Sequence, residues 1–320
     1  MISWCMGSTK ISTHEPGVFR LVLAFAVIYV VWGSTFLAIR FAVETLPPLV
    51  MMGTRQLTAG FLLFVWQRAR GEWRPERRLW RSALFCGAFC FLGGHSLLAW
   101  AELRVSSGLA SLLSATLPIW MVLFARARGQ ESELAPKTLS GIALGFAGVA
   151  ILLPPDFGGR PLETISALAI LVCEMLWAVG AIYARGVKTA TSPSTFAAMQ
   201  MLCGGALLCI VGLALGEGSR LGAFAWRSVL SLVFLIVFGS LLAFTVYTWL
   251  LQVSSPAIVS THSYVNPLVA VVLGWAFAGE RVTLRTVIGT AIILASVGLV
   301  SVRRKSATAS EELPAEATAS

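Results

Sequence analysis

Charged residues are scarce in this sequence. They make up 12% of its 320 residues, whereas a typical soluble domain is about a quarter charged. Hydrophobic residues account for 57% of the chain, and its mean hydropathy is +0.81. A chain with so few charges cannot cover a water-exposed surface of this size. The composition therefore excludes a soluble globular protein and indicates an integral membrane protein.

Sequence motifs of catalysis are also missing. The chain contains no H-E-x-x-H, no G-x-S-x-G and no Walker phosphate loop. The connections between its apolar runs are too short for a hidden soluble domain, so we expect neither an enzyme nor an ATP-driven pump, and no cofactor. No third ligand stands at metal spacing beside the two membrane histidines, which excludes a metal site. The net charge of +9 comes from basic residues in short loops, a distribution that does not favour nucleic-acid binding.

Long apolar runs are what the sequence has in abundance. None shows the alternation of a membrane β-barrel, and each is near the ~20 residues that a helix needs to cross a bilayer. The sequence therefore predicts an all-α membrane protein with ten transmembrane helices, flanked by a cytoplasmic N-terminal segment (1–19) and a disordered cytoplasmic tail (303–320). The expected spans are 20–41, 48–66, 82–101, 105–125, 137–153, 164–184, 194–215, 228–250, 255–277 and 284–302.

The distribution of basic residues predicts the orientation. If the N-terminus is cytoplasmic, sixteen of the 24 Lys and Arg residues lie inside, seven lie outside, and Arg55 lies within a span. An excess of basic residues marks cytoplasmic loops. We therefore expect both termini in the cytoplasm.

The two halves of the chain are related. At an offset of 145 residues Trp32 falls on Trp177, and at an offset of 149 Ser114 falls on Ser263. We expect two five-helix repeats, 20–153 and 164–302, joined by the loop 154–163. Because each repeat has an odd number of spans, the two must enter the membrane in opposite orientations. Inverted repeats of this kind recur in secondary transporters, where they surround a shared central site.

Three stretches carry a family likeness. They are Trp32–Gly60, which begins "WGSTFLAIR"; Ser106–Ala125, "SSGLASLLSATLPIWMVLFA"; and Ser254–Val300, which contains the pair Gly279-Glu280. Through them the chain resembles the EamA type of the drug/metabolite transporter superfamily. The resemblance covers about residues 20–302 and implies a ten-helix carrier with two inverted repeats and a central cavity. Such carriers export or exchange small metabolites, often amino acids, across bacterial inner membranes. The resemblance brings no universal functional residues.

One acidic residue, Glu174, and one basic residue, Arg55, lie inside predicted spans. Glu174 lies about ten residues into the sixth span, where an ionised carboxylate costs at least ~2.5–3.5 kcal/mol. It is a candidate to bind a proton or a substrate amine; the alternatives are an ion pair with Arg55 or a neutral, hydrogen-bonded acid. Arg55 is a candidate to bind a substrate carboxylate, unless it pairs with Glu44 or extends toward the membrane surface.

Further polar and aromatic residues are candidates for the same cavity. His262 and Asn266 are four residues apart and share one helix face, so we expect substrate or proton binding there. For His95, a hydrogen bond to neighbouring backbone is the competing interpretation. The repeat counterpart of Glu174 is Tyr29, on a face shared with Trp32. Aromatic residues that could wall the cavity are Trp32, Trp100, Trp177, Trp249 and Tyr264.

Two prolines occupy equivalent points of the repeats. Pro118 and Pro267 each remove a backbone donor in the middle of a span and should kink their helices as a shared hinge.

These features together predict a secondary transporter that exports small metabolites. Protons are the candidate coupling ion. The expected partners are a small-molecule substrate and membrane lipid, and the expected state is a monomer or a homodimer. A non-transporting membrane sensor or a lipid translocator is the alternative.

Overall fold

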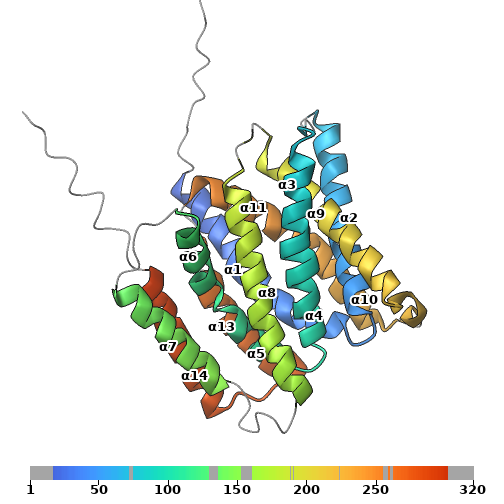
Figure 1. Cartoon of the computed structure of the whole chain (residues 1–320). Helices are drawn as coiled ribbons and strands as arrows, with labels where there is room; N and C mark the ends of the chain where they lie inside the picture. Colours follow the sequence, from blue (N-terminus) through green and yellow to red (C-terminus); the bar gives the residue numbers. More distant parts are fainter. Residues whose placement is uncertain are drawn as a thin grey trace, which may run out of the picture.

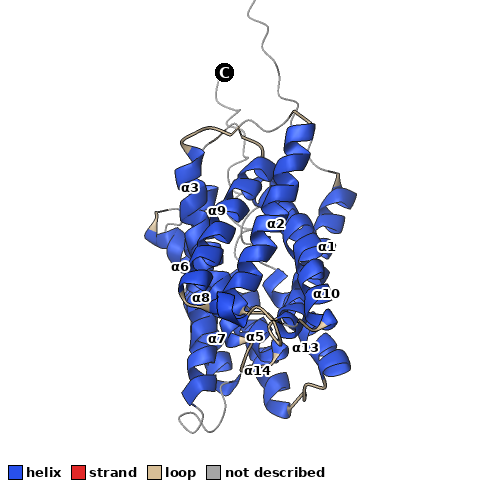
Figure 2. Ribbon diagram, turned by 90° about the vertical axis from the view of Figure 1, so that its right-hand side faces the viewer, coloured by secondary structure: helices blue, strands red, loops and turns tan. Residues whose placement is uncertain are grey.

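The computed structural model describes residues 17–71, 75–129, 136–152, 161–187, 189, 191–222, 224–254, 259 and 262–301. Within these ranges all regular secondary structure is helical (Figure 2). The expected N-terminal segment and inter-repeat loop are described only at their last residues, and the expected C-terminal tail lies outside the described residues.

Helices of the first half occupy the expected spans. The third span consists of three consecutive helical segments, and the fourth is divided into two helices. The elements are α1 (Val18–Ala42), α2 (Pro48–Ala69), α3 (Leu79–Cys86), η1 (Gly87–His95), α4 (Ser96–Ala101), α5 (Ser107–Ser114), α6 (Leu117–Ala127) and α7 (Pro136–Leu152).

The second half follows the same order. Its third span again consists of three consecutive segments. The elements are α8 (Pro161–Arg185), α9 (Pro193–Ala214), the short η2 (Glu217–Arg220), α10 (Trp226–Phe234), η3 (Leu235–Leu242), α11 (Ala243–Val253), α13 (His262–Ala278) and α14 (Leu284–Ser301).

Seven helical segments of the described chain are long and apolar enough to cross a membrane. The remaining three expected spans overlap α7, α13 and α14, which have 17, 17 and 18 residues. An all-helical multi-pass architecture is thus confirmed, while ten crossing helices in an inverted repeat stay a prediction.

Helices from the two halves pack directly against each other. α2 lies against α9, α7 lies beside α14, and α1 lies against α13 (Figure 1). α8, in turn, packs against α6 of the first half. Because the halves are interleaved in this way, a cavity in the middle of the bundle is lined by both.

Glycines allow the closest of these helix approaches. A Cβ atom at Gly205 of α9 would lie 2.6 Å from the backbone nitrogen of Leu57 in α2. Likewise, a Cβ at Gly87 of η1 would lie 2.7 Å from the backbone nitrogen of Gly204. Small residues at such crossings let helix backbones pack together inside a membrane.

The third span of each half contains a π-helical segment, η1 and η3. Wider π turns leave backbone carbonyls outside the regular α-helical ladder and often occur at functional sites. In η3 the carbonyl of Gly239 accepts a hydrogen bond of 3.1 Å from Trp32 Nε1. This bond joins α1 of the first half to the middle of the second.

The two equivalent prolines have different surroundings. α5 ends at Ser114, and α6 begins at Leu117 with Pro118 in its first turn, where a missing N–H costs nothing. Pro267 instead lies inside α13, which continues through it. A common hinge at both positions stays a prediction.

Candidate functional site

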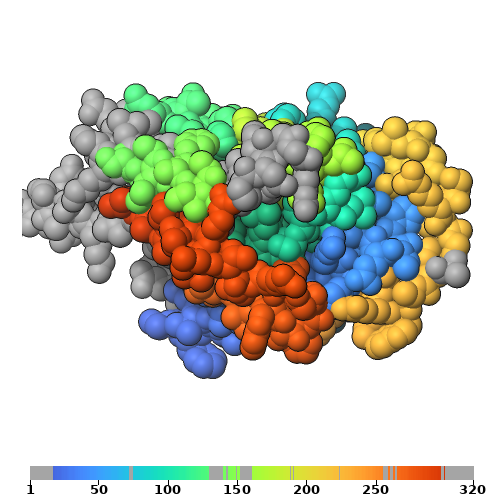
Figure 3. Space-filling view, turned by 90° about the horizontal axis from the view of Figure 1, so that it is seen from below, coloured from blue at the N-terminus to red at the C-terminus, as the bar shows by residue number. Residues whose placement is uncertain are grey.

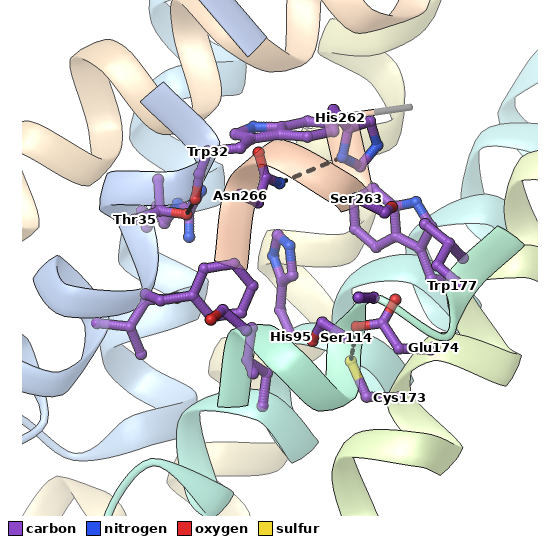
Figure 4. Close-up of a pocket in the computed structure, with 17 residues that line it drawn as sticks. Trp32, Thr35, His95, Ser114, Cys173, Glu174, Trp177, His262, Ser263 and Asn266 are labelled. Carbon is purple, nitrogen blue, oxygen red and sulfur yellow. Dashed lines mark hydrogen bonds between the residues drawn. The ribbon is translucent and has the colours of Figure 1, made fainter. Parts of the chain in front are cut away.

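A cavity lies in the middle of the bundle, between α1, α2, η1–α4, α5–α6, α8 and α13 (Figure 4). The centre of a water-sized sphere can occupy about 90 Å³ of it, several times the ~10–15 Å³ that one water molecule needs. Its lining residues are Trp32, Thr35, Phe36, Ile39, Arg55, His95, Leu98, Ser111, Ser114, Ala115, Leu117, Cys173, Glu174, Trp177, His262, Ser263 and Asn266.

Glu174 supplies a carboxyl group to this cavity. Its side chain comes from the middle of α8, is 7% exposed and accepts a contact of 3.7 Å from the thiol of Cys173. Ser114 at the end of α5 lies beside it (Figure 4). An ion pair between Glu174 and Arg55 does not occur in this structure. The Glu174 carboxyl group thus lines the cavity without a basic partner among the described residues.

Arg55 brings a buried cation to the same cavity. It is 3% exposed, and its Nε donates a hydrogen bond of 2.8 Å to Ser240 Oγ in η3. The expected alternative partner, Glu44, lies instead 3.8 Å from Arg227 on the surface. Both the pairing with Glu44 and an outward extension of the Arg55 side chain are thus wrong for this structure.

His95 ends η1 and points into the cavity (Figure 4). Its Nδ1 lies 3.0 Å from Nε2 of Gln56 on α2, so its partner is a side chain and not the neighbouring backbone that the competing interpretation expected. The imidazole also stacks on Trp177, with ring centroids 5.1 Å apart. A neutral imidazole is consistent with both contacts, because the amide then donates to the free ring nitrogen.

His262 and Asn266 of α13 form a second polar group. The His262 Nδ1 and the Asn266 amide are 3.2 Å apart. When the amide is assigned from its surroundings, Asn266 accepts from His262 and donates to the Tyr29 carbonyl at 3.0 Å. The other ring nitrogen of His262, Nε2, is buried and has no partner in the described part of the chain. This nitrogen is an acceptor available for a solute.

Aromatic rings close one wall of the cavity. The ring centroid of Trp32 lies 4.9 Å from that of His262, 4.8 Å from that of Tyr247 and 6.2 Å from that of Trp177. Edge-to-face and tilted contacts at these distances hold the rings in fixed orientations. The cavity therefore combines a rigid aromatic wall with one carboxyl group, one guanidinium and two imidazoles.

The sequence-based candidates do not all meet here. Tyr29, Trp100 and Trp249 do not line the cavity; Trp100 instead packs under the guanidinium of Arg104 at 4.7 Å. The side chain of Tyr264 lies outside the described residues. Their roles in transport stay predictions.

Other residues of the site were not anticipated from the sequence. Gln56, Gly239, Ser240 and Tyr247 contact cavity residues directly. Gln56, Gly239 and Ser240 could have been identified from the sequence, because each is a polar or small residue inside an apolar span. In the described part of the chain no three His, Cys, Asp or Glu side chains gather in a way that could hold a metal ion.

Comparison with known proteins identifies the class. The profile of the EamA-like transporter family matches residues 19–153 and again residues 164–302. The chain is therefore a membrane transporter by family, and it belongs to the EamA-like transporter family.

Proteins with sequences similar to this chain are also named as transporters. It is 33% identical over 281 residues to the uncharacterized inner membrane transporter YedA of Escherichia coli strain K12, covering 87% of this chain and 89% of the relative. It is 27% identical over 288 residues to the uncharacterized transporter YvbV of Bacillus subtilis strain 168, covering 89% and 93%. One solved crystal structure matches with a TM-score of 0.65 at 20% identity, covering 88% of this chain and 96% of that one. At this identity the match shows the fold alone.

Proposed function

We propose that this protein is a secondary active transporter that exports small metabolites, such as amino acids, across the bacterial inner membrane by alternating access. Its two halves, 20–153 and 164–302, would act as inverted repeats around the central cavity. Family membership favours transport over an enzymatic role, and the name of the relative YedA supports the inner membrane.

The observation that carries the proposal is the position of Glu174. This acid lies in the middle of a membrane-spanning helix and lines a cavity that both halves enclose. Burying an ionised carboxyl group in a membrane costs free energy, so such a group is found where it has a partner, a proton or a solute to bind. Without a basic partner within the described residues, Glu174 is suited to bind a proton or a solute amine in turn. Binding of one would then release the other, which is the exchange that proton-coupled export requires.

The interleaved packing supports alternating access. α2 of one half pairs with α9 of the other, and α7 pairs with α14. Rocking of one repeat against the other would open the cavity to each side of the membrane alternately. Both termini would lie in the cytoplasm, and the working unit would be a monomer or a homodimer.

Counterflow in liposomes tests this function. The purified protein is reconstituted, and the twenty amino acids and aromatic amines are screened with and without a pH gradient. We expect counterflow of at least one solute and stimulation by the gradient, which Glu174→Gln should abolish. Glu163→Gln, in the first turn of the same helix, is the matched control and should retain the stimulation. If Glu174→Gln transports with unchanged pH dependence, the coupling role of this residue is wrong.

A non-transporting sensor or a lipid translocator is the alternative function. Either would leave all small solutes unmoved in this assay, and a translocator would instead redistribute a fluorescent phospholipid between the leaflets of the same vesicles.

A further inference from the structure

Arg55 keeps most of its hydrogen-bonding capacity unused. A guanidinium has five N–H donors. One of these, on Nε, bonds to Ser240, and Nη1 has only the thioether sulfur of Met52 at 3.7 Å. Nη2 has no partner in the part of the chain that the structure describes. The unused donors are those of the outer fork, which is the face that grips a carboxylate with two parallel bonds.

No carboxylate of the described residues forms an ion pair with this cation. Within the described residues no Asp or Glu lies within 4.0 Å of its guanidinium nitrogens. Glu102 acts on it electrostatically without contact, and Glu174 lies by the thiol of Cys173. Leaving a buried charge without a counter-charge is strongly unfavourable. A site that retains such an arginine at membrane depth is therefore prepared for an anion that arrives from outside the chain.

The space beside Arg55 is kept open. A small side chamber adjoins the central cavity and shares Trp32, Arg55, His95 and Trp177 with it. Gly239 of η3 forms part of its wall, and a Cβ atom there would lie 2.8 Å from Arg55 Nη2. A larger residue at this position would collide with the guanidinium and take up part of the chamber. The chamber is thus small, lies next to the cavity, and has the polar side chains of Arg55, Gln56 and Ser240 in its wall.

We infer that Arg55 is the carboxylate-binding group of the transport site, and that the solute carries a carboxylate which enters this chamber. The inference rests on the proposed function and narrows its substrate class. Arg55 and Glu174 then give the cavity one positive and one negative group that do not neutralise each other. A zwitterionic solute matches this pair, while the aromatic wall around Trp32 is suited to its apolar part.

Competition between matched solutes tests the inference. The labelled solute that gives the strongest counterflow is competed by phenylalanine and phenylalaninamide, and by leucine and leucinamide, which differ only in the carboxylate. We expect each acid to compete at least tenfold better than its amide against the wild-type protein. Arg55→Gln should remove this preference. Arg55→Lys should retain part of it, because lysine keeps the charge but lacks the planar fork.

Arg68→Gln is the matched control. It removes a cation from the exposed last turn of the same helix α2 and leaves Arg55 in place, so the preference for the acid should persist. If Arg55→Gln does not fold, the wild-type comparison of acid and amide still decides the question. Equal competition by acid and amide would overturn the inference while leaving the transport function intact. Absence of counterflow for every solute would overturn both.

Discussion

Glu280, in the second half of the chain, caps the first turn of α5 at Ser107. Its Oε1 accepts hydrogen bonds of 2.8 Å from both the backbone N–H and the hydroxyl of Ser107, and its Oε2 accepts one of 3.0 Å from the N–H of Gly108. Glu280 follows α13, so the carboxylate joins the second half of the chain to the start of a helix in the first. A carboxylate at this position satisfies free N–H groups and interacts favourably with the helix dipole.

The N-terminus of α2 is capped by a carboxylate in the same way. Glu217, just after α9, accepts hydrogen bonds from the backbone N–H groups of Leu49 and Val50, the shorter ones being 3.0 and 2.9 Å. The N-termini of two helices in the first half, α2 and α5, are thus capped by carboxylates from the second half of the chain. Figure 3 shows the face on which the orange-red C-terminal helices meet the teal segment near residue 100.

We predict that loss of the Glu280 carboxylate destabilises the protein. Glu280→Ala leaves three donors without their acceptor and should cost about 1–3 kcal/mol; Glu280→Gln, which keeps one acceptor oxygen, should cost less. Thermal unfolding of the purified protein in detergent measures the change. Glu44→Gln is the control, because its pair with Arg227 is 3.8 Å long and 44% exposed on each side, and such pairs contribute little. Equal melting temperatures for Glu280→Ala and Glu44→Gln would contradict the capping role.

The sequence predicted much of this fold because its signals are local. Apolar runs fix the helices, and the offset of 145 places Trp32 and Trp177 at equivalent points of the two halves. In the structure their rings do meet, with centroids 6.2 Å apart. Glu174, Arg55 and His262 reach the same cavity because a charged or polar side chain inside a bilayer has few other places to go.

The remaining features could not be predicted, because they depend on packing between distant segments. A π-helical turn such as η1 has no reliable sequence pattern, since it depends on the neighbours against which the helix packs. Ser240 reads as an ordinary small residue until Arg55, 185 positions away, is found to donate to it. Trp100 and Trp249 lie 149 residues apart, at equivalent points of the two halves. Neither lines the cavity, because a sequence offset does not specify the direction in which a side chain leaves its helix.

We predict that Gly204→Ala is destabilising. A Cβ atom at this position would lie 2.8 Å from Cβ of Phe91 and 3.0 Å from the carbonyl of Gly87. Neither neighbour can move without separating α9 from η1, so overpacking should cost about 1–3 kcal/mol. Gly222→Ala, where nothing lies within 4 Å, is the control. A lower unfolding midpoint for Gly204→Ala alone is expected, and equal midpoints would show that this helix crossing is looser than described.

We predict that Glu102 makes stability depend on pH. It lies in the turn after α4, is fully buried, and has two carboxyl oxygens without partners among the described residues. Burial raises the pKa of this carboxyl group, as does Glu280, whereas Arg40 and Arg55 lower it, and burial is the largest effect. A carboxyl group whose pKa is raised by folding stabilises the protein while it is protonated, and this contribution is lost as the pH rises through the folded-state pKa.

Glu102→Gln should remove this dependence, because its amide does not ionise. Melting temperatures of the variant and the wild-type protein are compared at pH 5.5 and pH 8.5. The variant should gain stability relative to the wild type at the higher pH. A difference between the two proteins that is the same at both pH values would show that Glu102 stays in one protonation state.

We predict, finally, that the loop before α3 is cytoplasmic and the loop before α10 is periplasmic. The two positions chosen for labelling are Arg77 and Gly222, which are both exposed. Each is replaced by cysteine in a background that carries Cys5→Ser, and intact spheroplasts are treated with a membrane-impermeant maleimide. Gly222→Cys should be labelled at once, whereas Arg77→Cys should be labelled only after permeabilisation. The unsubstituted background corrects for Cys203 and Cys209, which are partly exposed. The reverse pattern would show that the protein has the opposite orientation in the membrane.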